Sequence, residues 1–119
     1  MNENIFWVLD TEIGEGKMED LKLLMTEMSD HTKANEPGTL NYEWFTSSDN
    51  KRCALFERYA DSAAALVHLS SFMKNFAKRF MEILTVKKFV VYGNPSDEFK
   101  DAVKSLGVIY YSPLGGFKR

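Results

Sequence analysis

The chain has 119 residues, of which 45% are hydrophobic and 27% charged, and its formal net charge is −2 at pH 7. This composition is typical of one globular domain, residues 1–119, because a chain of this length buries a full core without disulfides or metals. Without an excess of positive charge the chain lacks the field that holds a phosphate backbone, so nucleic acid is not an expected partner.

The distribution of apolar residues and the single cysteine argue against a membrane-spanning protein and against a secreted one. The longest stretch free of Asp, Glu, Lys and Arg runs from Ser105 to Phe117, and its 13 residues, like the 12 from Ser62 to Met73, are too few for a membrane-spanning helix, which needs about 20. The N-terminal residues lack the basic start and long apolar run of a signal peptide. Cys53 has no second cysteine to pair with, so we expect a soluble, cytoplasmic protein.

The first half of the chain predicts a strand, a helix and a hairpin. Residues 5–13 are rich in Ile, Phe, Trp, Val and Thr, which indicates a strand. Residues 39–47 and 52–59 are also strand-like, and the few polar residues between them predict a hairpin. The intervening helix is indicated by apolar residues at spacings of three and four, namely Met18, Leu21, Leu24, Met25 and Met28.

The second half predicts two helices and two strands. Asp61 is a plausible N-cap for a helix that runs to residue 80. Residues 84–92 are strand-like, and a third helix follows that opens at Pro95 and stops at Gly107, before a short strand at 108–111. The apolar stripe of the first of these helices is Ala65, Leu69, Phe72, Phe76 and Phe80, and that of the second is Phe99, Ala102, Val103 and Leu106.

The predicted order is β-α-β-β-α-β with a C-terminal α-β unit, an α+β chain of the split βαβ type. Two helices can cover one face of such a sheet, but the strands carry apolar residues on both sides: Phe6 and Val8 alternate with Ile5, Trp7 and Leu9. We therefore expect a homodimer in which the second sheet face packs on the same face of another copy.

Motifs for metals and organic cofactors are missing from the sequence. The two histidines, His31 and His68, lie in different segments, and no Cys/His cluster or His-Glu-x-x-His pattern accompanies them, so we expect no metal site. Residues 14–16 (Gly-Glu-Gly) match only the first two glycines of a dinucleotide loop and are better explained as a strand-to-helix turn. We expect no cofactor.

His68 is the strongest candidate for chemistry. On the predicted second helix it shares a side with Ala64, Ala65 and Phe72, so it stands on or beside the apolar stripe. An imidazole titrates near neutral pH, and in such a place it can accept a proton from a bound substrate. The alternative is a histidine at the edge of the core that bonds a backbone carbonyl.

Aromatic side chains form the second signal. Buried Trp and Tyr each need a polar partner, so we expect Trp7, Tyr42, Trp44 and Tyr59, all on predicted strands, to edge a pocket for a flat apolar ligand. Phe72, on the helix of His68, is a further candidate for the pocket wall. Plain core packing is the alternative for these aromatic residues.

Two charged residues lie inside the third predicted strand. Glu57 shares a side with Leu55 and Tyr59, whereas Arg58 lies on the other side. One of the two must therefore be buried or at an interface, where it needs a partner. An ion pair across the sheet or dimer is one interpretation, and orientation of His68 or of a substrate is the other.

Two segments carry a family resemblance. Residues 37–44 read Pro-Gly-Thr-Leu-x-Tyr-Glu-Trp, and residues 57–68 read Glu-Arg-Tyr-Ala-Asp-Ser-Ala-Ala-Ala-Leu-x-His. They resemble the antibiotic biosynthesis monooxygenase domain family, whose members are often labelled quinol monooxygenases. Residues 92–96 and 113–119 are similar to one extended subgroup, so the resemblance covers almost the whole chain.

The resemblance implies a ferredoxin-like subunit in a dimeric α/β barrel, and small-molecule chemistry without metal or organic cofactor. His68 matches the pocket-facing histidine of the family's second helix. Many relatives, including an autoinducer-processing isomerase branch, carry a second histidine, where this chain reads Ser-Ser-Phe-Met-Lys over residues 70–74. The Asn, Trp and His set of the haem-degrading branch is not supplied either.

The first functional hypothesis is a cofactor-independent monooxygenase that acts on a small quinol or polyphenol-like substrate and dioxygen. In it, His68 removes a proton, Tyr42, Trp44 and Tyr59 orient the substrate, and Arg58 or Lys88 holds the anion. Two alternatives remain open: a non-catalytic dimeric barrel that binds a small apolar ligand, and an isomerase of the autoinducer-processing type that uses the same base without oxygen.

Overall fold

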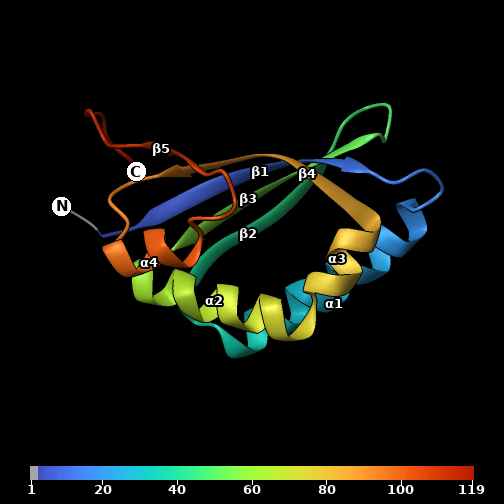
Figure 1. Ribbon diagram of the computed structural model, residues 1–119, viewed down its shortest axis with the longest axis horizontal. Coiled ribbons are helices and arrows are strands. Elements are labelled where there is room, and N and C mark those ends of the chain that lie inside the picture. Colours follow the sequence, from blue (N-terminus) through green and yellow to red (C-terminus); the bar gives the residue numbers. More distant parts are fainter. Residues whose placement is uncertain (1–2) are drawn as a thin grey trace.

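The computed structural model describes residues 3–119, which form a five-stranded mixed sheet and four helices (Figure 1). The chain order confirms the predicted α+β arrangement with its C-terminal α-β unit. The strands are β1 (Ile5–Ile13), β2 (Thr39–Thr46), β3 (Arg52–Tyr59), β4 (Leu84–Tyr92) and β5 (Ile109–Tyr111); the helices are α1 (Met18–Asn35), α2 (Ser62–Asn75), α3 (Ala77–Ile83) and α4 (Asp97–Ala102).

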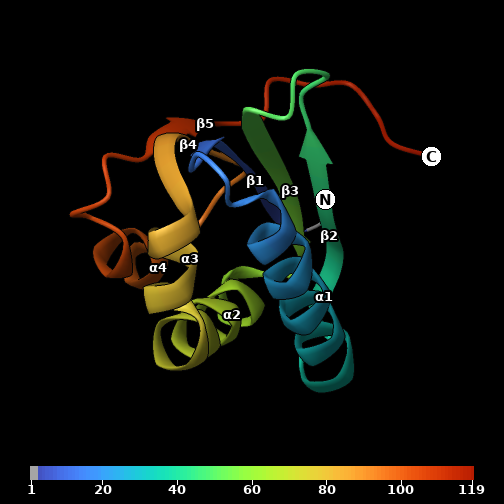
Figure 2. The same ribbon diagram turned by 90° about the vertical axis from the view of Figure 1, so that its right-hand side faces the viewer.

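The sheet has the strand order β2-β3-β1-β4-β5. Every pairing is antiparallel except the edge pair β4–β5, which is parallel because α4 carries the chain back between these strands. All the helices lie on one side of the sheet, as Figures 1 and 2 show. This is the ferredoxin-like fold expected from the sequence, and within the single chain the sheet remains open at β2 and β5.

Residues that alternate along the strands separate an inner face, under the helices, from an outer face. On β3 the inner positions are buried, and they include Leu55, Glu57 and Tyr59. The core lies between this face and the helices in two clusters, one around Leu24 and Phe80 and the other around Trp7 and Phe99. The carboxylate of Glu57 therefore lies at a position of β3 that faces the core.

The outer face also carries apolar side chains, as the strand pattern predicted. The Phe6 ring stacks on Tyr92 with 4.7 Å between centroids and lies 5.5 Å from the Phe56 ring. Tyr92 in turn stacks on Tyr111 of the edge strand at 5.4 Å. No helix covers these rings in the described part of the chain, so this face has the composition of a contact surface.

The second predicted helix is interrupted, contrary to the continuous apolar stripe of the sequence. Instead of running to Phe80, it ends at Asn75, and Phe76 has a non-helical backbone (φ −131°) before α3 begins. The break lets the two short helices follow the curved sheet in Figure 1, and it brings the Phe72 and Phe80 rings to 5.2 Å. Both Phe76 and Phe80 are still buried, as their stripe predicted.

The third predicted helix is shorter than expected. It begins at Asp97, because the Ser96 hydroxyl, and not Pro95, caps it by accepting a hydrogen bond from the backbone N–H of Phe99 at 3.1 Å. Helical geometry ends at Ala102, so Leu106 is not part of its buried stripe; this side chain is 54% exposed. Within residues 3–119 no helix has both the length and the apolar character needed to cross a bilayer.

Candidate active site

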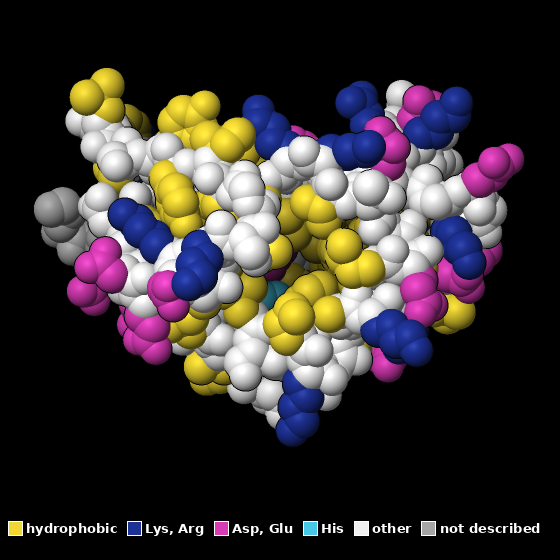
Figure 3. Space-filling model, in the orientation of Figure 1, with side chains coloured by type: hydrophobic (Ala, Val, Ile, Leu, Met, Phe, Trp, Pro, Cys, Tyr) yellow, Lys and Arg dark blue, Asp and Glu magenta, His cyan; other side chains and the backbone are white. Residues whose placement is uncertain are grey.

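A cavity of about 380 Å³ lies between the inner face of the sheet and helices α2 and α3. Its wall is mostly apolar, and the ionisable side chains among its lining residues are Tyr42, Glu57 and His68. Figure 3 shows this region as a hollow with a histidine at the bottom and hydrophobic side chains around it. A small site of this kind suits a mostly apolar ligand that presents a polar group to one end.

The start of α2 fixes the position of His68. The Asp61 carboxylate accepts a hydrogen bond from the backbone N–H of Ala64 at 2.8 Å and so caps the helix, as the sequence predicted. From this start the helical period turns Ala65 and His68 toward the sheet, and His68 is only 5% exposed. Its ring reaches the cavity from the helical side.

The His68 ring lies between two buried carboxylates. Nδ1 is 2.8 Å from Oε1 of Glu36, and Nε2 is 3.2 Å from Oε1 of Glu57. The Tyr59 hydroxyl donates a hydrogen bond of 2.7 Å to the same Glu57 oxygen, and the Thr39 hydroxyl donates one of 3.3 Å to Oε1 of Glu36. Glu36, Glu57 and His68 are hereafter called the acidic triad.

Glu36 was not predicted as a site residue. It is the C-cap of α1, and its backbone N–H donates to the carbonyl of Thr32. A negative charge at the C-terminal end of a helix is opposed by the helix dipole, so its presence there is the one sequence signal that points to a separate role. Its Oε2 atom is buried and has no hydrogen-bond partner among the described residues.

The triad holds a proton on His68 at neutral pH. Burial by itself would lower the pKa of His68, but the hydrogen bonds and charges of Glu36 and Glu57 outweigh it and raise the pKa to about 9. The triad thus places an imidazolium between two carboxyl side chains at the wall of an apolar cavity.

The two tyrosines of the site remain neutral near pH 7. Burial, followed by the charges of Glu57 and Glu36, raises the pKa of Tyr42 far above its usual range. Burial and Glu57 likewise raise the pKa of Tyr59. Neither phenol therefore ionises near neutral pH, and the Tyr59 hydroxyl remains a hydrogen-bond donor to Glu57.

The structure brings most of the predicted aromatic residues to the cavity. Trp7, Tyr42 and Phe72 line it, and the Tyr42 ring lies 5.1 Å from the His68 ring. Tyr59 stands behind this wall, 4.6 Å from the Trp7 ring, and acts through Glu57. Trp44 does not line the cavity; its ring packs on Tyr42 at 5.8 Å and supports it from the side.

Arg58 and Lys88 do not belong to this site. Strand alternation places Arg58 on the outer face, where it donates hydrogen bonds to the side-chain oxygens of Asn4 at 2.6 Å and Asn41 at 2.7 Å. Lys88 pairs in register with Asp10, an outer-face position of β1. The expectation that one of these cations holds a substrate anion in the cavity is therefore wrong.

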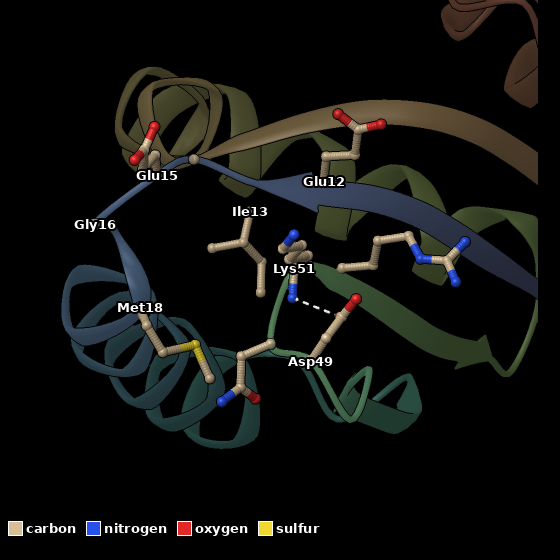
Figure 4. A pocket seen from close by; sticks show the side chains of 10 residues that line it. Glu12, Ile13, Glu15, Gly16, Met18, Asp49 and Lys51 are labelled. Carbon is tan, nitrogen blue, oxygen red and sulfur yellow. Dashed lines mark hydrogen bonds between the residues drawn. The ribbon is translucent and has the colours of Figure 1, made fainter.

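A second hollow, of about 800 Å³, lies between the β1–α1 turn and the β2–β3 hairpin (Figure 4). Its charged lining residues, among them Glu12, Asp49 and Lys51, are exposed to solvent. The Asp49 carboxylate accepts a hydrogen bond of 3.0 Å from the backbone N–H of Lys51 and thereby stabilises the hairpin. This hollow offers no buried ionisable group, so the acidic triad is the better candidate for chemistry.

Within residues 3–119, no three or more His, Cys, Asp or Glu side chains are grouped so as to hold a metal ion. The model of one protein family, antibiotic biosynthesis monooxygenase, matches residues 7–105. The chain belongs to this family. The matched region includes all three members of the acidic triad, and family membership supports a monooxygenase-like role.

Solved structures show the same fold as this antibiotic biosynthesis monooxygenase family member. MupZ from Pseudomonas fluorescens has a TM-score of 0.87 at 19% identity, and the match covers 99% of this chain and 96% of MupZ. Rv0793 from Mycobacterium tuberculosis has a TM-score of 0.65 at 26% identity, covering 79% of this chain and 96% of that protein. SO0527 from Shewanella oneidensis has a TM-score of 0.57 at 25% identity, covering 76% and 88%.

The share of the chain that is matched separates these relatives. The MupZ match extends over nearly the whole chain of this antibiotic biosynthesis monooxygenase family member, whereas the matches to Rv0793 and SO0527 leave about a fifth to a quarter of it uncovered. The family model ends at residue 105, before β5. No curated protein matches the chain.

Proposed function

We propose that the protein is a cofactor-independent monooxygenase that acts on a small quinol or polyphenol-like substrate. The observation that carries this proposal is a histidine held between two buried carboxylates at the wall of an apolar cavity. A phenolic substrate can supply its own electrons to dioxygen once it loses a proton. The protein then needs only a proton acceptor, a dry cavity and a positive charge near the anion.

The pair formed by Glu57 and His68 is the proposed proton acceptor. Tyr59 and His68 both face Oε1 of Glu57, which leaves Oε2, among the described residues, as the oxygen open to a ligand. The substrate hydroxyl transfers its proton to this carboxylate, and the His68 imidazolium remains to stabilise the phenolate. Glu36 acts as a positioning residue, since its bond to Nδ1 fixes the orientation of the ring.

The oxygen step balances without another reductant. A ring carbon of the phenolate forms a bond to dioxygen, and the resulting peroxide receives the proton held by Glu57. The hydroperoxide O–O bond then breaks as the hydrogen on that carbon leaves, which gives a carbonyl and one molecule of water. The substrate thus loses two hydrogens and gains one oxygen atom, and the second oxygen atom is reduced to water by the substrate's own two electrons.

Oxygen uptake by the purified protein with a panel of quinols tests this proposal. Wild type is expected to consume one dioxygen per substrate, and His68→Ala is expected to lower kcat by about 10²–10⁴-fold, because the acceptor pair loses its positive partner. His31→Ala is the matched control, since His31 bonds Ser71 outside the cavity.

Two outcomes would favour the other hypotheses. Binding of quinols without any oxygen uptake would indicate a non-catalytic ligand-binding barrel. Conversion of the substrate that persists under argon would indicate an isomerase using the same acceptor. Equal uptake by wild type and His68→Ala would remove His68 from the mechanism.

We also infer that two copies pair through the outer sheet face. This face carries the stacked rings of Phe6, Tyr92 and Tyr111, and Phe45 on it is 54% exposed. Sedimentation is expected to give a dimer for wild type and a monomer for Phe56→Glu, because a charge is then buried between the sheets. Leu23→Glu on α1, remote from this face, should remain dimeric, and a monomeric wild type would refute the interface.

A further inference from the structure

The cavity of the acidic triad opens at an apolar rim. Met73, Met81 and Leu106 all line the cavity, yet their exposed fractions are 69%, 59% and 54%. Figure 3 shows hydrophobic side chains that surround the hollow and continue onto the molecular surface. These three residues are hereafter called the apolar rim.

The rim is assembled from three separate elements. Met73 belongs to α2, Met81 to α3, and Leu106 to the segment that follows α4. The break at Phe76 is what allows α2 and α3 to contribute one side chain each. Since exposed large apolar side chains cost free energy, three of them around a single opening indicate a contact with an apolar group from outside.

Polarity changes from one end of the cavity to the other. Glu57 and His68 lie at the closed inner end, whereas the rim offers only thioether and alkyl groups. Methionine side chains are flexible and polarisable, so they adapt to a chain of variable conformation better than to a rigid ring. At about 380 Å³ the cavity is at the lower end of ligand pockets and suits one small ring system, with space for more only beyond the rim.

We propose that the substrate carries an aliphatic chain that leaves the cavity across the apolar rim, while its phenolic hydroxyl faces Glu57. This inference rests on the proposed function for the orientation of the ring, and it adds the substrate class: an alkyl-substituted quinol or phenol. The outer sheet face, where we infer dimerisation, lies on the opposite side of the sheet from the helices, so pairing of two copies leaves the rim open.

Binding of a homologous series of 2-alkylquinols under argon tests the inference, because no turnover is then required. With chains of zero to six carbons, the Kd measured by calorimetry is expected to fall by about threefold per methylene over the first few carbons and then to level off. In the double variant Met73→Gln/Met81→Gln, which keeps the side-chain length but adds polar groups, this dependence is expected to flatten.

Leu23→Gln is the matched control, because Leu23 is 67% exposed on α1 and does not line the cavity. It should preserve the chain-length dependence of wild type. Equal affinity for all chain lengths in wild type, or an unchanged dependence in the double variant, would overturn the inference even if oxygen uptake is observed. Self-association through the rim would also overturn it, and would appear as sedimentation that the double variant alters.

Discussion

Replacing Glu57 by Gln is expected to lower kcat for quinol oxidation by about 10²–10⁴-fold, with little loss of substrate binding. The amide keeps the size of the side chain and can still accept a hydrogen bond from Tyr59, but it cannot take the substrate proton. The substitution should therefore lower kcat strongly and leave KM almost unchanged. Oxygen uptake under saturating substrate measures it directly.

Glu43→Gln is the matched control for this substitution. Glu43 is also a strand glutamate, but it is exposed on β2 and accepts a hydrogen bond from Asn41 outside the cavity. Its variant should retain the kcat of wild type. Thermal unfolding of both variants distinguishes a loss of chemistry from a loss of fold, and a folded Glu57→Gln protein with normal kcat would contradict the role of Glu57.

The free energy of unfolding is expected to decrease as the pH rises from 6.5 to about 9. The ordinary pKa of histidine is 6.5, and the pKa of His68 in the folded protein is raised to about 9. Between the two values the folded state holds a proton that the unfolded chain has released, so a rise in pH favours unfolding. The stabilisation is complete below pH 6.5 and is lost through pH 9, a decrease of about 3 kcal/mol.

Urea unfolding at constant protein concentration, between pH 6 and pH 10, measures this decrease. His68→Gln should be less stable than wild type at pH 6 and should lack most of the decrease, because its side chain does not titrate. His31→Gln should retain the decrease in stability with pH, since the His31 ring packs against Phe76 and not against the carboxylates of the acidic triad. Parallel curves for wild type and His68→Gln would show that the triad does not hold the proton.

The fold could be predicted because its signals are periodic and local. Alternation along β1 and β3, the three-and-four spacing of α1 and the Asp61 cap each depend on residues close in sequence. The break at Phe76 could not be predicted, since no Pro or Gly marks it and the curvature of the sheet that it follows is a tertiary property.

The candidate site was predicted only in part. Strand alternation required either Glu57 or Arg58 to face inward, and helix periodicity placed His68 near the core, but which charge met the ring depended on the register of β3. Glu36 lies 32 residues from His68 and at a helix end, where no period applies. The apolar spacing assigned Leu106 to the buried stripe of the third helix, but α4 ends at Ala102, so the helical spacing no longer applies at Leu106.

The unpartnered Oε2 atom of Glu36 limits the routes by which protons can leave the acidic triad. This oxygen is buried, and within residues 3–119 no hydrogen-bonded group continues from it toward the surface. This oxygen therefore cannot pass a proton to the surface through hydrogen-bonded groups of the described residues. The proposed reaction obeys this restriction, because the proton taken from the phenol departs in the water molecule formed, and turnover should accordingly be indifferent to buffer concentration.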